Sequence, residues 1–301
     1  MPSFSVLICT YNRPDMLAKS LAALIDRTIE KPDQIVIVNG GDERSDLIVQ
    51  GYMGRNGIEV RLVKTVNRNL AASRNLGLAY CTGDIVAMTD DDAEVFPNWV
   101  TQMKKVHSDH PEAGAVGGAV IGAESAHHLL SRIADIATFS SPPQPEYVRT
   151  LAGVNVSYKS AALQSVGLQD ETLFRGEDVD FNWRIKNLGY EIFYHPDIKV
   201  LHHHRPRLKG LINQFYMYGR AYYLVRKKWP EMYCVYPHHI RSLRDSLKAI
   251  NVFLRLFYLP IVNSLQLEGW KERLSSTPIF FVTGLYWNWG VYYQKRHVND
   301  G

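Results

Sequence analysis

The stretch DIVAMTDDD, residues 84–92, is a short apolar run that leads directly into three adjacent aspartates. Its composition predicts a buried strand over Asp84–Thr89 with a polar cluster at the carboxyl end. Similar runs alternate with helix-spaced apolar residues, which predicts an α/β fold: a mostly parallel sheet with helices on both faces. The other predicted strands are Phe4–Cys9, Gln34–Val38, Ile58–Val63 and Ala115–Ile121, and the first predicted helices are Pro14–Ile25 and Leu70–Tyr80.

Polar residues follow three of these strands where each strand ends. Thr10-Tyr11-Asn12 follows the first, Asn39-Gly40 the second and Asp90-Asp91-Asp92 the fourth. Ligands of open α/β sheets bind beyond the carboxyl ends of the strands. We therefore expect the three clusters to meet in one crevice.

The triple aspartate is the strongest local signal in the chain. Adjacent carboxylates repel one another, so a fold tolerates them where a cation or solvent neutralises their charge. Hard oxygen ligands suit Mg²⁺ or Mn²⁺, held together with substrate phosphates. The alternative is a solvated acidic turn.

A second acidic cluster, Gly176–Phe181 (GEDVDF), lies at the start of a helix predicted over Val179–Leu188. Acidic residues also stabilise a helix N-terminus, which is the alternative interpretation. Asp180 and Arg184 are four residues apart and are expected to pair. Glu177 and Asp178 then remain to face the crevice, where a carboxylate can act as a general base.

Histidines and arginines add further candidates. His202-His203-His204 follows a predicted strand over 198–201, after another over 191–194, and alternation puts His202 and His204 on one side. That triplet predicts a metal or phosphate contact, whereas His127-His128 is expected to lie on the surface. The segment Asn67–Gly77 (NRNLAASRNLG) carries Arg68 and Arg74 at a helix start, which favours phosphate binding over an ordinary solvated helix start.

Composition limits the class of protein. The chain has 301 residues, of which 46% are hydrophobic and 21% charged, and this excludes disorder, collagen and coiled coil. A mean hydropathy of −0.19 excludes a multi-span membrane protein. The three cysteines are far apart in sequence, which excludes a disulfide framework and a cysteine zinc motif. No basic, apolar signal stretch opens the sequence, so the expected location is cytoplasmic.

Charge is distributed unevenly along the chain. Residues 1–204 contain 19 Lys and Arg against 25 Asp and Glu, a net charge of −6, whereas residues 205–301 contain 15 against 5, a net charge of +10. We expect a catalytic domain over 1–205 and a basic-aromatic helical extension over 206–301, with long helices over 208–229 and 242–265. The extension predicts an anionic partner: lipid headgroups, a polyanionic acceptor or nucleic acid.

The uncharged segment Ile279–Tyr293 is shorter than the ~20 residues that a membrane span needs. Its aromatic residues precede Lys295-Arg296 and resemble interfacial anchors. The sequence leaves four interpretations open: a helix packed on the catalytic body, peripheral binding to the cytoplasmic face of a membrane, an oligomer contact and a span. The residues of this segment that resemble interfacial anchors are Trp287, Trp289, Tyr292 and Tyr293.

Taken together, these motifs resemble the family 2 glycosyltransferases, which have the GT-A fold. The resemblance covers about residues 3–220 and rests on the order and spacing of several motifs. They are Val6–Pro14 (VLICTYNRP), Asn67–Gly77, Asp90-Asp91-Asp92, Gly153–Tyr158 (GVNVSY), Glu177-Asp178 followed by Arg184, and His202–Gly219.

The resemblance implies an inverting transfer of a sugar from a nucleotide-diphosphate sugar to an acceptor hydroxyl. It implies Asp178 as the catalytic base, with Glu177 beside it as a second catalytic residue, and Asp90, Asp92 and His202 as ligands of Mg²⁺ or Mn²⁺. It further implies a nucleotide-binding half over about 1–120 and an acceptor-binding half over about 121–205. The implied nucleotide-sugar contacts are Thr10, Tyr11, Asn12, Arg13, Asn39, Asn67, Arg74, Asp90, Asp91, Gly153 and Asn155.

Asn39 departs from the family pattern, which has Asp at this strand end for contact with uracil. The Asn carbonyl oxygen can still accept that hydrogen bond, and Asp42 is a possible substitute. UDP, GDP and dTDP sugars therefore stay open as donors, with a glycan or a lipid-linked molecule as acceptor.

Three other functions compete with this interpretation. A nucleotidyltransferase would carry a Gly-rich basic loop after the first strand, and Thr10–Pro14 contains no Gly. A non-catalytic nucleotide-sugar-binding module would be expected to lose carboxylates. Nucleic-acid binding is disfavoured because the acidic body would repel phosphates.

Overall fold

The computed structural model describes residues 2–123, 128–139, 141–203, 207–232 and 242–298. The described chain forms two compact units. The first comprises residues up to 121 together with 139–203, and the second comprises 122–138 together with the residues from 204 onward. The sequence predicts a boundary at 205/206, and the second unit also includes residues 122–138, which the sequence assigns to the acceptor-binding half.

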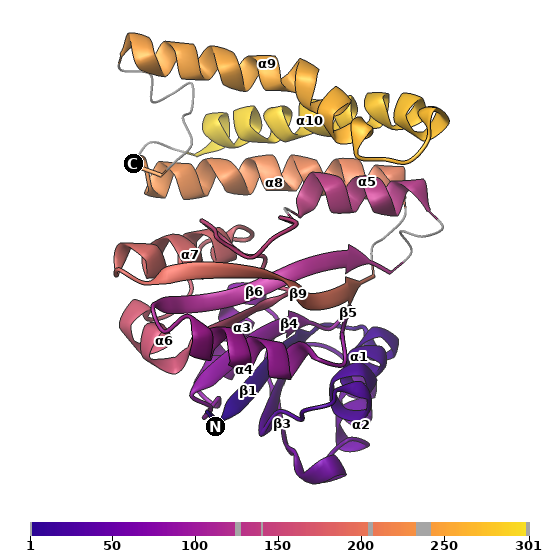
Figure 1. Cartoon of the computed structure of the whole chain (residues 1–301), viewed down its shortest axis with the longest axis vertical. Coiled ribbons are helices and arrows are strands. Elements are labelled where there is room, and N and C mark those ends of the chain that lie inside the picture. Colours follow the sequence, from indigo (N-terminus) through magenta and orange to yellow (C-terminus); the bar gives the residue numbers. More distant parts are fainter. Residues whose placement is uncertain (1, 124–127, 140, 204–206, 233–241, 299–301) are drawn as a thin grey trace. The chain divides into compact units, whose positions relative to one another are not determined.

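A single mixed sheet organises the first unit, in the order β3-β2-β1-β4-β8-β6-β9-β5, with β7 paired to β9 (Figure 1). The pairs β1–β2, β1–β4 and β2–β3 are parallel. The pairs β4–β8, β6–β8, β5–β9 and β7–β9 are antiparallel. The strands are β1 (Phe4–Thr10), β2 (Gln34–Asn39), β3 (Glu59–Lys64), β4 (Ile85–Asp90), β5 (Ala93–Val95), β6 (Ala113–Gly122), β7 (Glu146–Tyr147), β8 (Val156–Lys159) and β9 (Glu191–His202).

Helices cover both faces of this sheet, as the alternation along the chain predicts. Val6 and Ile8 of β1 point to one face, where they pack with Leu17 and Trp99. Leu7 points to the opposite face. The helices of the first unit are α1 (Pro14–Leu21), η1 (Ala22–Arg27), α2 (Glu43–Gln50), η2 (Arg55–Gly57), α3 (Leu70–Leu78), α4 (Trp99–Asp109), α6 (Ser160–Val166) and α7 (Glu177–Asn187).

Parallel pairing is confined to the first four strands, so the sheet is mixed rather than parallel throughout. The predicted strands over 191–194 and 198–201 are one strand, β9, which continues through Pro196. Helix α7 begins at Glu177, two residues before the predicted start, because Gly176 has φ +80° and ends the preceding loop. Strand direction depends on the tertiary course of the chain, for which apolar spacing carries no signal.

The second unit is helical, with α5 (Leu129–Thr138), α8 (Leu208–Lys228), α9 (Leu243–Leu265) and α10 (Trp270–His297). Its core contains Ile133 of α5, Phe215 of α8 and Phe280 of α10. Among the residues that the structure describes, no helix combines the length and the apolar character that crossing a membrane requires.

Two glycines let α8 and α10 cross with their backbones in contact. A Cβ atom on Gly219 would lie 1.9 Å from the carbonyl oxygen of Trp287, and one on Gly290 would lie 2.1 Å from that of Tyr216. Both distances are far below a van der Waals contact. Any side chain at either position would push the two helices apart.

We predict that Gly219→Ala destabilises the protein although alanine favours a helix. Overpacking should lower the free energy of unfolding by about 1–3 kcal/mol, measured by denaturant unfolding. Gly210→Ala on the same helix is the matched control, because a Cβ there would meet nothing closer than 4.0 Å. That change should leave stability equal or raise it by up to about 1 kcal/mol. Equal stability of both variants would contradict the tight crossing.

Candidate active site

The register of the parallel strands brings their carboxyl ends together at one edge. Thr10 of β1 lies opposite Asn39 of β2, which lies opposite Lys64 of β3. On the other side of β1, Asp90 at the end of β4 lies opposite Cys9. The polar clusters predicted to converge do so because the parallel strands end at the same level in the sheet.

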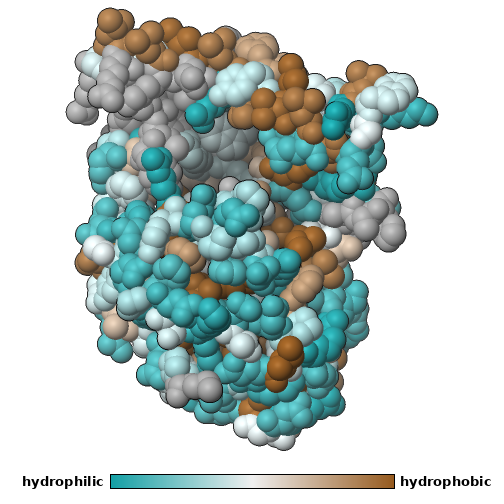
Figure 2. Space-filling view, in the orientation of Figure 1, coloured by the Kyte–Doolittle hydropathy of each residue, from teal (hydrophilic) through white to brown (hydrophobic). Residues whose placement is uncertain are grey.

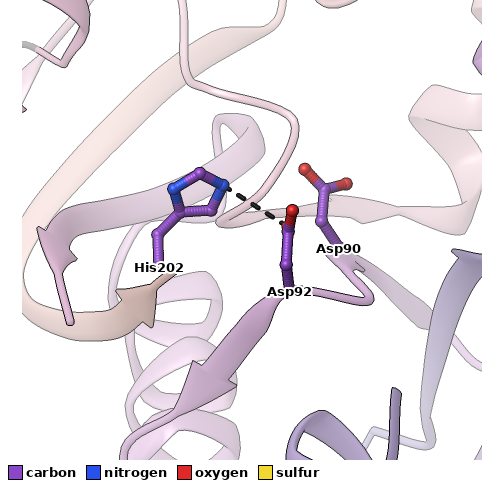
Figure 3. Close-up of side chains that lie close together, drawn as sticks. All are labelled: Asp90, Asp92 and His202. Carbon is purple, nitrogen blue, oxygen red and sulfur yellow. Dashed lines mark ion pairs between the residues drawn. The ribbon is translucent and has the colours of Figure 1, made fainter. Parts of the chain in front are cut away.

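Asp90, Asp92 and His202 form a group suited to a metal ion (Figure 3). One ligand atom from each lies within 4.8 Å of the other two. His202 reaches the group because β9 pairs with β5, which places His202 opposite Ala93, the residue after Asp92. Its Nε2 lies 3.4 Å from Oδ1 of Asp92. Two carboxylates and an imidazole fit a divalent cation such as Mg²⁺ or Mn²⁺.

Asp91, the central aspartate, has a different role from its neighbours. Its side chain is buried and accepts hydrogen bonds from Thr10 Oγ1 at 2.7 Å and from Arg13 Nη1 at 3.1 Å. Burial raises the pKa of the Asp91 carboxyl to about 6. Asp91 and Thr10 therefore anchor the turn after β1 and do not join the metal group.

Arg13 bridges Asp91 to the metal group. The same Nη1 atom lies 2.5 Å from Oδ2 of Asp92. Burial opposes ionisation of Asp92, but the hydrogen bond to His202 and the charge of Arg13 hold the pKa of Asp92 below its usual value. Arg13 is only half-buried, so its guanidinium can also reach an anion at the edge of the sheet.

Arg74 lies at the centre of the site and is 3% exposed. Its Nη1 donates to Oε1 of Glu177 at 3.1 Å, and its Nη2 donates to Oδ1 of Asp90 at 3.2 Å and to the carbonyl oxygen of Gly153 at 3.4 Å. The sequence predicts a phosphate contact for Arg74. In the structure its donors instead hold two carboxylates and one loop in place.

Gly153 is required at its position by this arrangement. A Cβ atom there would lie 2.7 Å from Nη1 of Arg74. The backbone N–H of Gly153 donates to Oδ2 of Asp178 at 3.2 Å, and the N–H of Val179 donates to Oδ1 at 2.8 Å. Both oxygens of Asp178 are therefore oriented by backbone amides, while the side chain stays half-buried.

Glu177 is buried beside Asp178 and Arg74. Burial, reinforced by the charge of Asp178, raises the pKa of Glu177 to about 7 despite the opposing charge of Arg74. The predicted pair Asp180–Arg184 is confirmed, with Nε of Arg184 3.0 Å from Oδ2 of Asp180. The second acidic cluster therefore divides only in part as predicted: Asp180 pairs with Arg184, but Glu177 is buried against Arg74 and only Asp178 is half-buried.

Asn39 is buried, and its amide makes internal hydrogen bonds. Its Nδ2 donates to Oδ1 of Asp46 at 2.7 Å and to the carbonyl oxygen of Asp42, while its Oδ1 accepts from the N–H of Gly41. The Asp42 side chain caps α2 by accepting from Ser45. Both residues predicted to face a nucleobase thus serve the loop after β2.

Asn155 and His203 also make internal contacts. Asn155 is 1% exposed, donates to the carbonyl oxygens of Ala119 and Ile198, and accepts from Nε1 of Trp99 at 2.8 Å. His203 lies on the other side of the chain from His202, with Nε2 2.7 Å from Oε1 of Glu94. His127 and His204 lie outside the described residues.

Three of the predicted nucleotide contacts are exposed at the edge of the sheet: Tyr11, Asn12 and Asn67. Asn12 has φ +54°, and a Cβ on Gly41 would lie 2.5 Å from its backbone nitrogen. A Cβ on Gly40 would lie 3.1 Å from Cβ of Asn67. The loops after β1, β2 and β3 therefore pack closely and present these side chains together.

Sequence reasoning did not identify Glu171 as part of this edge. Its Oε2 lies 3.0 Å from Nη1 of Arg68, and its Oε1 accepts from Asn75. Asn69 donates to the backbone carbonyl of Glu171. The asparagines of the segment 67–77 were the available signal for this contact, since Asn69 and Asn75 donate hydrogen bonds from α3 and its N-cap to Glu171.

We predict that Glu177 makes stability depend on pH when no ligand is added. Because its folded pKa lies above the value of about 4.3 for an unfolded chain, the folded state binds a proton more tightly between pH 4.5 and 7. Stability should therefore fall as pH rises through this range, by about 1–3 kcal/mol from this group. Urea unfolding at several pH values measures the slope.

Glu177→Gln should reduce that slope, leaving the smaller part due to Asp91. Glu43→Gln, at an exposed position in the first turn of α2, is the matched control and should keep the wild-type slope. An unchanged slope in Glu177→Gln would show that the carboxyl is not held in its protonated form by burial.

Comparisons with known proteins agree with this architecture. Residues 5–154, about half of the chain, match the family described as glycosyl transferase family 2. A glucosyl-dolichyl phosphate glucuronosyltransferase of Haloferax volcanii is 30% identical over 186 residues, which cover 58% of this chain and 58% of that protein. A pre-mycofactocin glycosyltransferase of Mycobacterium tuberculosis is 31% identical over 156 residues, 50% of this chain and 33% of that protein.

Solved structures share the fold. A mannosyltransferase of Pyrobaculum calidifontis, in complex with GDP-Man and Mn²⁺, superposes with a TM-score of 0.64 at 17% identity, over 96% of this chain and 87% of that one. Staphylococcus aureus TarS 1–349 in complex with UDP gives a TM-score of 0.59 at 14% identity, over 99% and 93%. The chain spans 58% and 33% of the lengths of the two relatives named above. On the family match and the shared GT-A fold, this chain belongs to glycosyl transferase family 2.

Proposed function

We propose that the chain transfers a sugar from a nucleotide-diphosphate sugar to an acceptor hydroxyl, with inversion at the anomeric carbon and with a divalent cation. The observation that carries this proposal is the grouping of Asp90, Asp92 and His202 at the carboxyl edge of the sheet. Asp178 joins the same network, since Gly153 contacts both Asp178 and Arg74.

Charge supports a cation in this reaction. The site gathers five acidic side chains against two guanidinium groups, so a diphosphate would meet net repulsion even with Glu177 protonated. A divalent cation would reverse that balance, and Mg²⁺ or Mn²⁺ usually binds through one or two carboxylates together with substrate phosphates. The carboxylates are those of Asp90, Asp91, Asp92, Glu177 and Asp178, and the guanidinium groups are those of Arg13 and Arg74.

Asp90, Asp92 and His202 would hold the ion. When bound, it supplies Lewis-acid stabilisation of negative charge on the departing diphosphate. Arg13, half-buried beside Asp92, would contact the same phosphates. Arg74 would orient Asp90 and oppose the rise in the pKa of Asp90 that burial causes.

Asp178 would act as the general base. Its two oxygens are oriented by the N–H groups of Gly153 and Val179. The carboxylate would take the proton of the acceptor hydroxyl as the oxygen attacks the anomeric carbon from the side opposite the leaving group. A single displacement inverts that carbon and needs no covalent enzyme intermediate.

The donor nucleotide would lie against the exposed edge formed by Tyr11, Asn12 and Asn67. The neighbours with known ligands bind GDP-Man or UDP, which supports a nucleoside diphosphate without selecting its base. Because the amide of Asn39 is committed to Asp46 and Gly41, we propose that base recognition comes from the exposed side chains instead.

For the acceptor we propose a glycan or a lipid-linked molecule, bound in the half of the first unit that follows residue 120. One relative is named for transfer to a glucosyl-dolichyl phosphate, which supports a lipid-linked acceptor. We further propose an anionic membrane surface as a partner of the second unit, because residues 205–301 carry a net charge of +10.

We predict that Asp92→Asn abolishes most turnover while the protein stays folded. Loss of a metal ligand should cost roughly 10³-fold or more in turnover, and titration calorimetry should show weaker Mn²⁺ binding. Asp15→Asn, at an exposed position, is the control and should behave as wild type. Full activity of the wild type in excess chelator would contradict the metal assignment.

We predict that Asp178→Asn abolishes transfer but leaves binding of the nucleotide near wild type, because the base contacts the acceptor. The loss should be about 10²–10⁴-fold in the transfer rate. Measurement requires a panel of nucleotide sugars, screened first by hydrolysis, which needs no acceptor. If Asp178→Asn weakens nucleotide binding as much as transfer, Asp178 belongs to the donor site. If Glu177→Gln is the more damaging change, the roles of the two acids are reversed.

A further inference from the structure

Helix α9 exposes a continuous row of large apolar side chains, which we name the α9 stripe. Successive members are four and three residues apart, which puts them on one side of the helix. Each exposes half or more of its surface, and Figure 2 shows hydrophobic side chains gathered along this helix. The α9 stripe consists of Leu243, Leu247, Ile250, Leu254, Phe257 and Ile261.

The apolar face widens toward the end of the helix. Tyr258, Leu259, Val262 and Leu265 are also exposed, by 38–57%. A narrow seam of the kind that pairs two coiled-coil helices has only two apolar positions in seven. The breadth of this face instead suits a helix that lies in a lipid interface.

The remaining side of α9 packs within the second unit. Pro260 and Ser264 are buried, and a Cβ on Gly284 of α10 would lie 3.2 Å from Cδ1 of Leu256. Soluble proteins rarely expose an apolar face as continuous as the α9 stripe unless it meets a partner.

The charge of the second unit selects among possible partners. Residues 205–301 carry 15 Lys and Arg against 5 Asp and Glu. Lys271, Arg273, Lys295 and Arg296 are exposed on α10. Two copies of so basic a unit repel one another, whereas anionic headgroups attract it.

We infer that the α9 stripe is the surface by which the second unit binds an anionic lipid bilayer, lying along the interface with its apolar side chains at the depth of the headgroups. This inference rests on the proposed membrane partner and assigns its contact face. The sequence places the anchor in the aromatic cluster of α10. There, the ring centroids of Trp287 and Tyr222 lie 4.9 Å apart, and those of Tyr293 and Tyr216 lie 5.9 Å apart. The side chains of Trp287 and Tyr293 therefore pack α10 against α8.

The test is co-sedimentation of the full chain with vesicles of phosphatidylcholine alone or mixed with phosphatidylglycerol. The wild type should bind the mixed vesicles, and binding should weaken at about 0.5 M salt, where the screening length is a few ångströms. The triple variant Leu247→Gln, Ile250→Gln, Ile261→Gln should bind them at least about tenfold more weakly. Its far-UV circular dichroism and melting temperature should match the wild type, since all three side chains are exposed.

The matched control is the triple variant Leu47→Gln, Leu168→Gln, Leu188→Gln, which removes equally exposed apolar side chains from the first unit. It should sediment with vesicles as the wild type does. Failure of the wild type to bind mixed vesicles, or equal binding by the α9 variant, would overturn the inference. A wild-type dimer that the α9 variant converts to monomer, seen by analytical ultracentrifugation without lipid, would assign the stripe to a second copy instead.

Donor hydrolysis without vesicles separates this inference from the proposed reaction. The α9 variant should retain wild-type hydrolysis, because its substitutions lie outside the catalytic residues. If hydrolysis is absent in every protein while vesicle binding follows the pattern above, the proposed reaction fails and the membrane face stands.

Discussion

The site depends on one buried cation, the guanidinium of Arg74. It contacts Asp90 at the end of β4, Glu177 at the start of α7 and the carbonyl oxygen of Gly153 between them. These segments come from distant parts of the sequence, and two of them bring carboxylates that would repel each other when buried. Removing one partner of a buried ion pair leaves an uncompensated charge, at a cost of roughly 3–5 kcal/mol. Arg74 therefore links the strand that carries Asp90 to the helix that carries Glu177 and Asp178.

The three adjacent aspartates have different surroundings: Arg74 contacts Asp90, and Arg13 contacts both Asp91 and Asp92. Asp91 turns inward to Thr10 and Arg13, while Asp90 and Asp92 stay half-buried on the side of His202. Two carboxylates separated by one inward-facing residue thus lie close to His202. Had all three carboxylates faced solvent, the turn after β1 would have lost its anchor.

Much of this arrangement could be predicted from sequence, because the alternation of strands and helices predicts parallel pairing of the first strands, whose carboxyl ends then meet at one edge. The grouping of Asp90, Asp92 and His202 agrees with the prediction, and a metal ion bound there stays a prediction. The carboxylate partners of Arg74 were not predicted, since a guanidinium suits phosphate and carboxylate equally and only the tertiary fold decides between them. The internal hydrogen bond of Asn39 was not predicted either, because its amide donates to Asp46, seven residues later in the chain. Strand direction beyond β4 leaves no local signal.

The two units differ in the sign of their excess charge, and their surfaces differ accordingly. The first unit concentrates carboxylates and neutralises them with guanidinium groups that are buried or half-buried. The second has an excess of cations, which solvent or an anionic partner must neutralise. Charge alone attracts a unit to a membrane but does not hold it there, because salt screens that attraction within about 10 Å. An apolar face such as the α9 stripe adds a contribution that salt does not screen, so retention on lipid requires both features on one unit.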